Sequence, residues 1–315
     1  MALHSFPSKI LLFGEYTILL GSKALAIPYP HFSGHLEVVN HDYLPEKEKQ
    51  KFLSFEILKS FYNYIIKTID HTDLVDRFDN KKFVSDLEKS LSFNSSIPNG
   101  FGLGSSGALT AAVYDRYFNA SDRNNIDHLL EIKKHLAYLE SFFHQSSSGI
   151  DPLVSYCNRP LLLQNDCIDS VKLPGKSKKQ FSTFLVNTQI KRSAANLVAD
   201  FLKKCENISY LYSITSELIT ANNACIDAIM EENTEMFFQH LQQLSEFQFH
   251  NFKTLIPNPI LPFWEKGLHT GQYYLKICGA GGGGYLLGFT RIENLFSENK
   301  QQQIFDDFRL LKVEY

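Results

Sequence analysis

The chain has 315 residues, a formal net charge of −3, 44% hydrophobic residues and 21% charged residues. This composition is typical of a globular protein with one large domain or two. The lack of a basic excess argues against nucleic acid or an anionic membrane as a partner. No apolar run approaches the length of a membrane span, and no signal peptide is evident. The five cysteines form no CxxC pattern, so we expect buried thiols in a cytoplasmic protein rather than a zinc or disulfide framework.

The N-terminal segment predicts a β-hairpin. Residues 9–20 form an apolar run that is interrupted at Gly14-Glu15 and then resumes, and a turn leads to a second strand at 24–28. Lys9 opens the first strand and Glu15 interrupts it. Taken alone, each fits an ordinary exposed residue, at a strand end and in a turn.

Apolar periodicity predicts the remaining elements. We expect helices at 42–70 and 124–144 (capped by Asn124 or Asn125), mostly helix over 190–255, and strands at 83–93, 161–163, 184–187 and on both sides of a glycine loop in 273–289. The change from strand to helix near 185–192 suggests two domains, 1–188 and 189–315.

Residues 98–108 read Pro-Asn-Gly-Phe-Gly-Leu-Gly-Ser-Ser-Gly-Ala and continue into a helical stretch. Glycine lets the backbone approach phosphate oxygens, and the first N–H groups of a helix have no partner inside it. The run therefore predicts an anion-binding loop. It is neither a Walker A loop, since no Lys follows, nor a dinucleotide fingerprint. A flexible turn before a helix is the alternative.

Two polar clusters follow. Glu140 and His144 are spaced i, i+4 on one helix face, and Asp151 follows a serine-rich turn; a surface pair and a turn cap are the ordinary alternatives. Farther on, Thr188, Lys191 and Arg192 lie where a strand runs into a helix. Cations at a helix start are unfavourable for the helix dipole, which favours an anionic ligand there.

The run Gly281–Gly284 lies between two apolar strands. Ordering four consecutive glycines costs backbone entropy, so this segment predicts a close approach of ligand or chain to the backbone, with a flexible tip as the alternative.

Three of these stretches together resemble the GHMP small-molecule kinases. Pro98-x-x-x-Gly-Leu-Gly-Ser-Ser-Gly-Ala is similar to their phosphate-binding motif, Lys9-Ile-Leu-Leu-Phe-Gly-Glu-Tyr to the first motif and Lys276-Ile-Cys-Gly-Ala-Gly-Gly-Gly-Gly to the third. They occur in the family's order over nearly the whole chain. Within the superfamily, Glu140-x-x-x-His-x-x-x-Ser-Gly-Ile-Asp151 resembles mevalonate kinases.

The resemblance implies a two-domain α/β (α+β) fold. The N-terminal domain, ATP-binding and catalytic, would resemble ribosomal protein S5 domain 2, and the C-terminal GHMP kinase domain would be ferredoxin-like, with ATP and acceptor meeting in the cleft between them. It also implies ATP and Mg²⁺ as cofactors and a small alcohol such as mevalonate as substrate, in isoprenoid biosynthesis.

The resemblance assigns a role to each matching residue. Asp151 and Lys9 would be catalytic, with Lys9 stabilising charge on the transferring group. Ser106 and Glu140 would hold Mg²⁺. The ATP-binding residues would be Pro98, Gly100, Gly102, Leu103, Gly104, Ser105, Ser106 and Gly107, and the substrate-binding residues Glu15, Tyr16, His144, Thr188, Arg192, Gly281 and Gly282.

The chain departs from the mevalonate kinase pattern at several positions. Tyr16 replaces a usual His, as is typical of phosphomevalonate kinases; Gln145 replaces Gly, Gly107 replaces Ala, and the region 42–97 is short. These departures concern the acceptor more than the chemistry. The alternatives are therefore a phosphomevalonate or sugar kinase of the same superfamily, and a non-catalytic ligand-binding or regulatory protein with this fold. A monomer and a homodimer are both compatible with the sequence.

Overall fold

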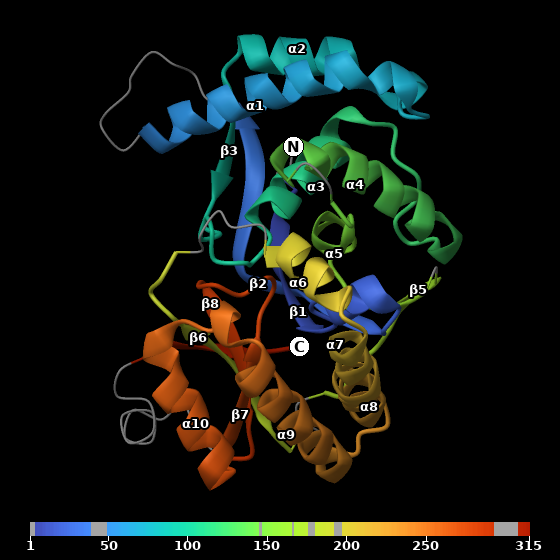
Figure 1. Ribbon diagram of the computed structural model, residues 1–315. Coiled ribbons are helices and arrows are strands. Elements are labelled where there is room, and N and C mark those ends of the chain that lie inside the picture. Colours follow the sequence, from blue (N-terminus) through green and yellow to red (C-terminus); the bar gives the residue numbers. More distant parts are fainter. Residues whose placement is uncertain are drawn as a thin grey trace. The chain divides into compact units, whose positions relative to one another are not determined.

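A computed structural model describes residues 4–38, 49–144, 147–165, 167–175, 180–191, 197–292 and 308–315 (Figure 1). The chain forms two compact units. The first comprises Met1–Lys9, Pro28–Pro98 and Leu103–Arg159, and the second comprises Ile10–Ile27, Asn99–Gly102 and Pro160–Tyr315. This division by contacts differs from the domains 1–188 and 189–315 expected from the sequence, which stay a prediction.

The first sheet has the strand order β1-β2-β4-β5, with β3 pairing with β2. Its strands are β1 Phe6–Phe13, β2 Ala24–Val38, β3 Leu91–Ser95, β4 Leu161–Gln164 and β5 Cys167–Ser170. The β2–β3 pair is antiparallel from Gly34↔Ser95 to Val38↔Leu91. Strands β1 and β2 each contribute residues to both units.

The helices of the first unit are α1 Lys49–Thr68, α2 Asn80–Glu88, α3 Ser105–Tyr117, α4 Leu129–His144 and α5 Ile150–Cys157. Helix α3 packs against both α4 and α5. Its small residues Gly107, Ala108, Ala111 and Ala112 are buried, which permits close approach of these helices. This packing brings the N-terminal ends of α3 and α5 together.

The second unit contains a four-stranded antiparallel sheet of order β7-β8-β6-β9. Its strands are β6 Ser182–Asn187, β7 Tyr273–Ile277, β8 Tyr285–Thr290 and β9 Leu310–Val313. Its helices are α6 Leu197–Cys205, α7 Ile208–Ser213, α8 Thr220–Met230, α9 Thr234–Asn251 and α10 Leu261–Thr270. Helices α9 and α10 pack on β7, and α8 lies beside α9 (Figure 1).

Most predicted elements are confirmed, and three expectations are wrong. The apolar run after Gly14 does not resume as a strand but forms a 3-10 helix, Thr17–Leu20. Residues 83–87, expected as a strand, lie in α2, which Asp79 caps by accepting a hydrogen bond from the Lys82 N–H. Among the cysteines, Cys167 is exposed and Cys157 is half-buried rather than buried, although all five are free thiols. Asn125, one of the two expected caps, does cap the turn before α4.

A mixed α+β fold of this kind is the one expected from the sequence. Within the described residues, no helix combines the length and apolar character that crossing a membrane requires.

Candidate functional site

The loop that precedes α3 contains three glycines in the left-handed backbone conformation. Gly100, Gly102 and Gly104 have φ angles of 81°, 84° and 75°, a region that side-chain-bearing residues avoid. Helix α3 begins at Ser105, and within the described part of the chain no side chain caps it. The first N–H groups of α3 and its dipole therefore favour an anion at this end, as the sequence predicts.

Lys9 and Asp151 form an ion pair next to this loop. The Lys9 Nζ lies 2.8 Å from Asp151 Oδ1; the Lys9 side chain is 5% exposed and that of Asp151 is 34% exposed. The Lys9 N–H also donates to the Leu103 carbonyl over 3.0 Å, which ties β1 to the loop. The structure thus places a buried cation and an accessible carboxylate together in the first unit.

Two glycines allow this pair to lie so close to the loop. A Cβ atom built on Gly104 would lie 2.9 Å from Lys9 Cγ and 3.7 Å from Asp151 Oδ2. One built on Gly107 would lie 2.9 Å from the carbonyl carbon of Asp151 and 2.9 Å from Pro152 N. Because real Cβ atoms keep about 3.5–4.0 Å from carbon neighbours, these positions admit only glycine without a local movement.

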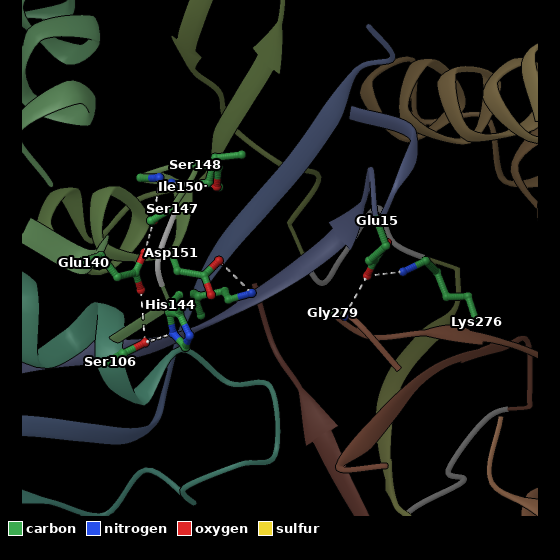
Figure 2. Close-up of polar contacts among 12 residues, drawn as sticks. Glu15, Ser106, Glu140, His144, Ser147, Ser148, Ile150, Asp151, Lys276 and Gly279 are labelled. Carbon is green, nitrogen blue, oxygen red and sulfur yellow. Dashed lines mark hydrogen bonds and ion pairs between the residues drawn. The ribbon is translucent and has the colours of Figure 1, made fainter. Parts of the chain in front are cut away.

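Glu140 lies at the C-terminal end of α4, in a cluster of hydroxyl groups (Figure 2). The Ser106 hydroxyl donates to Glu140 Oε1 over 3.1 Å, and the Ser147 hydroxyl donates to Oε2 over 2.5 Å. The Ser106 Oγ also lies 2.9 Å from His144 Nε2. Burial, followed by the negative charge of Asp151, raises the pKa of Glu140 to about 7.

This donor set fits Mg²⁺. Carboxylate and hydroxyl oxygens are ligands that this hard cation prefers. Burial and the charge of Asp151 disfavour the ionised form of Glu140, and a cation bound beside it would favour that form. Ser106 and Glu140 are the two ligands predicted from the sequence. Ser147 was not predicted; its position in a serine-rich turn seven residues after Glu140 was the available signal.

A different group of possible metal ligands, Asp73, Glu131 and His135, lies elsewhere in the first unit. However, Arg77 and Ser121 already hydrogen-bond to the two carboxylate oxygens of Glu131. A positively charged guanidinium at this position makes a cation site unfavourable.

The second unit brings together another set of predicted residues around the third glycine motif. Glu15 Oε1 lies 2.6 Å from Lys276 Nζ and accepts from the Gly279 N–H over 3.3 Å (Figure 2). The Tyr16 hydroxyl donates to the Ala280 carbonyl. The Thr188 hydroxyl donates to the Gly284 carbonyl over 2.7 Å. The polar atoms of these three predicted substrate-binding residues thus contact the chain itself.

For the remaining residues predicted from the sequence, the structure gives the backbone conformation, a single packing contact or no description. Gly281 and Gly282 lie in the loop between β7 and β8 and have φ angles of 75° and 74°. A Cβ on Gly100 would lie 3.0 Å from Lys191 Cε, so the stem of that lysine packs along the first glycine loop. Arg192 and Gln145 lie outside the described residues. Lys276 was not singled out by sequence reasoning, although a lysine inside the buried strand β7 was a signal.

Comparisons with known proteins find relatives among small-molecule kinases. The family described as GHMP kinases N terminal domain matches residues 63–159. A mevalonate kinase of Dictyostelium discoideum is 23% identical over 352 aligned positions, covering 90% of this chain and 86% of the relative.

Two solved structures share the fold over almost the whole chain. The L. major mevalonate kinase in complex with R-mevalonate has a TM-score of 0.63 and 14% identity, covering 100% of this chain and 96% of that one. The Streptococcus pneumoniae phosphomevalonate kinase in complex with phosphomevalonate and AMPPNP has a TM-score of 0.61 and 16% identity, covering 99% of both chains. Residues 63–159 thus match the N-terminal domain of GHMP kinases, and the chain as a whole has the fold of these two kinases and resembles a mevalonate kinase in sequence.

Proposed function

We propose that this protein is an ATP-dependent kinase that phosphorylates a small-molecule hydroxyl, most specifically that of mevalonate to give 5-phosphomevalonate in isoprenoid biosynthesis. The observation that carries the proposal is the Lys9–Asp151 pair, packed against the glycine loop at the start of α3. A carboxylate able to take a proton, a cation beside it and an anion-binding helix end are what phosphoryl transfer requires of a protein.

In this proposal Asp151 acts on the acceptor. Its partly exposed carboxylate accepts the proton of the acceptor hydroxyl. The acceptor oxygen forms a bond to the γ-phosphorus of ATP, and the bond from that phosphorus to the bridging oxygen breaks, so ADP leaves. Lys9 lies 2.8 Å from Asp151 and stabilises negative charge as it redistributes among these oxygens.

The N-terminal end of α3 would hold the ATP phosphates. The backbone from Gly100 to Ser106 supplies the cradle, and the dipole of α3 favours their charge. Ser106 and Glu140 would hold Mg²⁺, consistent with the oxygen donors and the raised pKa of Glu140. When bound, Mg²⁺ supplies neutralisation of phosphate charge.

Mevalonate is the proposed acceptor because the curated relative is a mevalonate kinase and because the segment Glu140–Asp151 has that family's pattern. Phosphomevalonate is the first alternative, and Tyr16 is the residue that favours it, since a tyrosine there is typical of phosphomevalonate kinases. A sugar kinase is the other catalytic alternative. A non-catalytic protein of this fold is a further alternative, but it would not need the paired Lys9 and Asp151.

The test is ADP release from Mg-ATP, measured in a coupled assay with mevalonate, phosphomevalonate, and a panel of sugars and amino alcohols. Turnover with mevalonate alone is expected, and it should be lost in Asp151→Asn. Turnover with a different acceptor only would support the proposed phosphoryl transfer but reject mevalonate as the substrate. Binding of Mg-ATP without turnover on any acceptor would favour the non-catalytic alternative.

A further inference from the structure

The glycine loop between β7 and β8 is fixed by hydrogen bonds from several segments of the second unit. The Gly282 N–H donates to the Leu255 carbonyl and the Gly284 N–H to the Ile190 carbonyl, both over 2.7 Å. Gly279 and Gly281–Gly284 all have positive φ angles, from 74° to 140°. A run of glycines has many conformations open to it, so these external partners select the one observed.

The N-terminal end of this loop is held by a buried ion pair. Glu15 Oε1 bonds both to Lys276 Nζ over 2.6 Å and to the Gly279 N–H over 3.3 Å. Lys276 also donates to the Ile277 carbonyl over 2.7 Å. The side chains of Lys276 and Glu15 are 1% and 2% exposed. One carboxylate therefore connects the first motif, the last residues of β7 and the start of the loop.

Stability alone does not account for such a pair. Removing two charges from water costs free energy that their attraction repays only in part, and apolar residues of similar volume often stabilise a core as well or better. Two further described neighbours of Lys276, Phe13 and Cys225, are neutral. The Lys276 Nζ lies over the Phe13 ring, and burial raises the pKa of the nearby Cys225 thiol, which therefore stays protonated. Within the described part of the chain, Glu15 is the acidic partner that the structure gives Lys276.

The neighbouring residue, Tyr16, also holds the glycine loop. Its φ angle of 65° is unfavourable for a residue with a large side chain. Its ring packs against Phe201 and Phe252, with ring centroids 4.8 Å and 5.7 Å away, and its hydroxyl donates to the Ala280 carbonyl. The turn at Glu15-Tyr16 thus directs two successive side chains at two successive loop residues.

We propose that Glu15 and Lys276 are positioning residues: their buried pair fixes the start of the glycine loop, so that Gly281 and Gly282 keep one backbone conformation for the acceptor. This inference rests on the proposed kinase function for its kinetic part only. Glu15 then acts through Gly279 rather than by contact with the acceptor.

The decisive variant is Glu15→Leu/Lys276→Met. It removes both charges together and leaves side chains of similar volume, so no buried charge is stranded and the thermal midpoint should stay close to that of the wild type. The anchor on Gly279 is lost. We expect kcat/KM for the acceptor to fall about 10–100-fold, the scale of a misplaced binding group. Amide hydrogen exchange in residues 277–285 should accelerate at least about 10-fold.

Two companion variants separate positioning from general stability. Glu15→Gln/Lys276→Met keeps an amide oxygen that can accept from the Gly279 N–H, so exchange and kinetics should lie between those of the wild type and the first variant. Lys23→Met/Asp227→Asn removes a partly exposed ion pair of the same unit, for which the structure shows no contact with the loop among the described residues. It should leave both readouts unchanged.

Wild-type exchange and kinetics in a folded Glu15→Leu/Lys276→Met protein would overturn the inference. If that variant does not fold, Glu15→Gln/Lys276→Met decides: exchange in 277–285 equal to that of the wild type would show that the loop does not need the ion pair, and would overturn the inference. The exchange measurement needs no substrate. A protein without kinase activity would therefore contradict the proposed function while the anchoring of the loop could still be upheld or rejected.

Discussion

Gly107→Ala tests whether close packing of α3 against α5 sets the position of Asp151. The added Cβ would lie 2.9 Å from the Asp151 carbonyl carbon and from Pro152 N. Comfortable contacts are about 3.5–4.0 Å, so roughly 0.6–1 Å of movement is required. The atoms that it meets are backbone rather than the end of a flexible side chain, so the first turn of α5 must move with Asp151.

The expected effect on stability is smaller than the effect on activity. Alanine inside a helix is favoured over glycine by about 0.8–1 kcal/mol, whereas overpacking costs about 1–3 kcal/mol. The two partly cancel, so the net loss of unfolding free energy should be at most about 2 kcal/mol. A displacement of Asp151 by this distance should lower kcat about 10–100-fold, because a misplacement near 1 Å can cost about two orders of magnitude.

The assay is steady-state ADP release with the acceptor that the wild type uses, beside a thermal unfolding curve. Gly175→Ala is the matched control, because a Cβ there meets nothing within 4 Å; it should leave kcat unchanged. A Gly107→Ala protein that is folded and keeps the wild-type kcat would refute the reasoning, since α5 would then accept the methyl group without moving the carboxylate.

Three further outcomes are expected. Asp151→Asn and Lys9→Met should each lower kcat about 10²-fold or more, the scale of a lost proton acceptor or of lost charge stabilisation; near-normal turnover in both would contradict the proposed roles. Ser106→Ala should raise the Mg²⁺ concentration that gives half-maximal turnover, and an unchanged Mg²⁺ titration would remove Ser106 from the metal site. With a thiol reagent at pH 8, the exposed Cys167 should react first; burial raises the pKa of Cys157 to about 11, so its labelling should accelerate about tenfold per pH unit up to pH 10, as followed by mass spectrometry.

The sequence was sufficient to predict the local parts of the site. Contiguous motifs identified the loop before α3, and the i, i+4 spacing placed Glu140 and His144 on one face of α4, where both lie near Ser106. These predictions depend on short-range geometry, which a single sequence carries. Likewise, the strands on both sides of Gly281–Gly284 follow from apolar runs alone.

The misassigned segment at 83–87 shows where such reasoning stops. Its alternation of apolar and polar residues favours a strand, but Asp86 is buried because Arg116 donates to it over 2.8 Å and Tyr117 over 2.9 Å. A polar side chain whose hydrogen bonds come from another helix can lie in the core, although its residue type suggests an exposed position. The partner lies about thirty residues away, so periodicity could not reveal it.

The Glu15–Lys276 pair could not be predicted from the sequence for the same reason, because its two partners are still farther apart along the chain. The two residues are 261 positions apart, and Glu15 alone fits an ordinary exposed charge in a turn. Only the packing of β7 against the first motif shows that both are buried. The resemblance assigned Glu15 to the acceptor because Glu15 matches a family motif. A motif does not distinguish a residue that contacts the ligand from a residue that positions a ligand-binding loop.

The glycines of the loop before α3 illustrate the same distinction within one motif. Gly100, Gly102 and Gly104 have positive φ angles, so their conformation itself excludes most other residues. Gly107 lies inside α3, and a side chain is excluded there because the backbone of α5 lies too close. Substitutions in the first group should therefore disturb the anion cradle, whereas a substitution at Gly107 should disturb Asp151 first. Weaker ATP binding would follow from the former and slower turnover from the latter, so the two kinds of glycine are separable by KM and kcat.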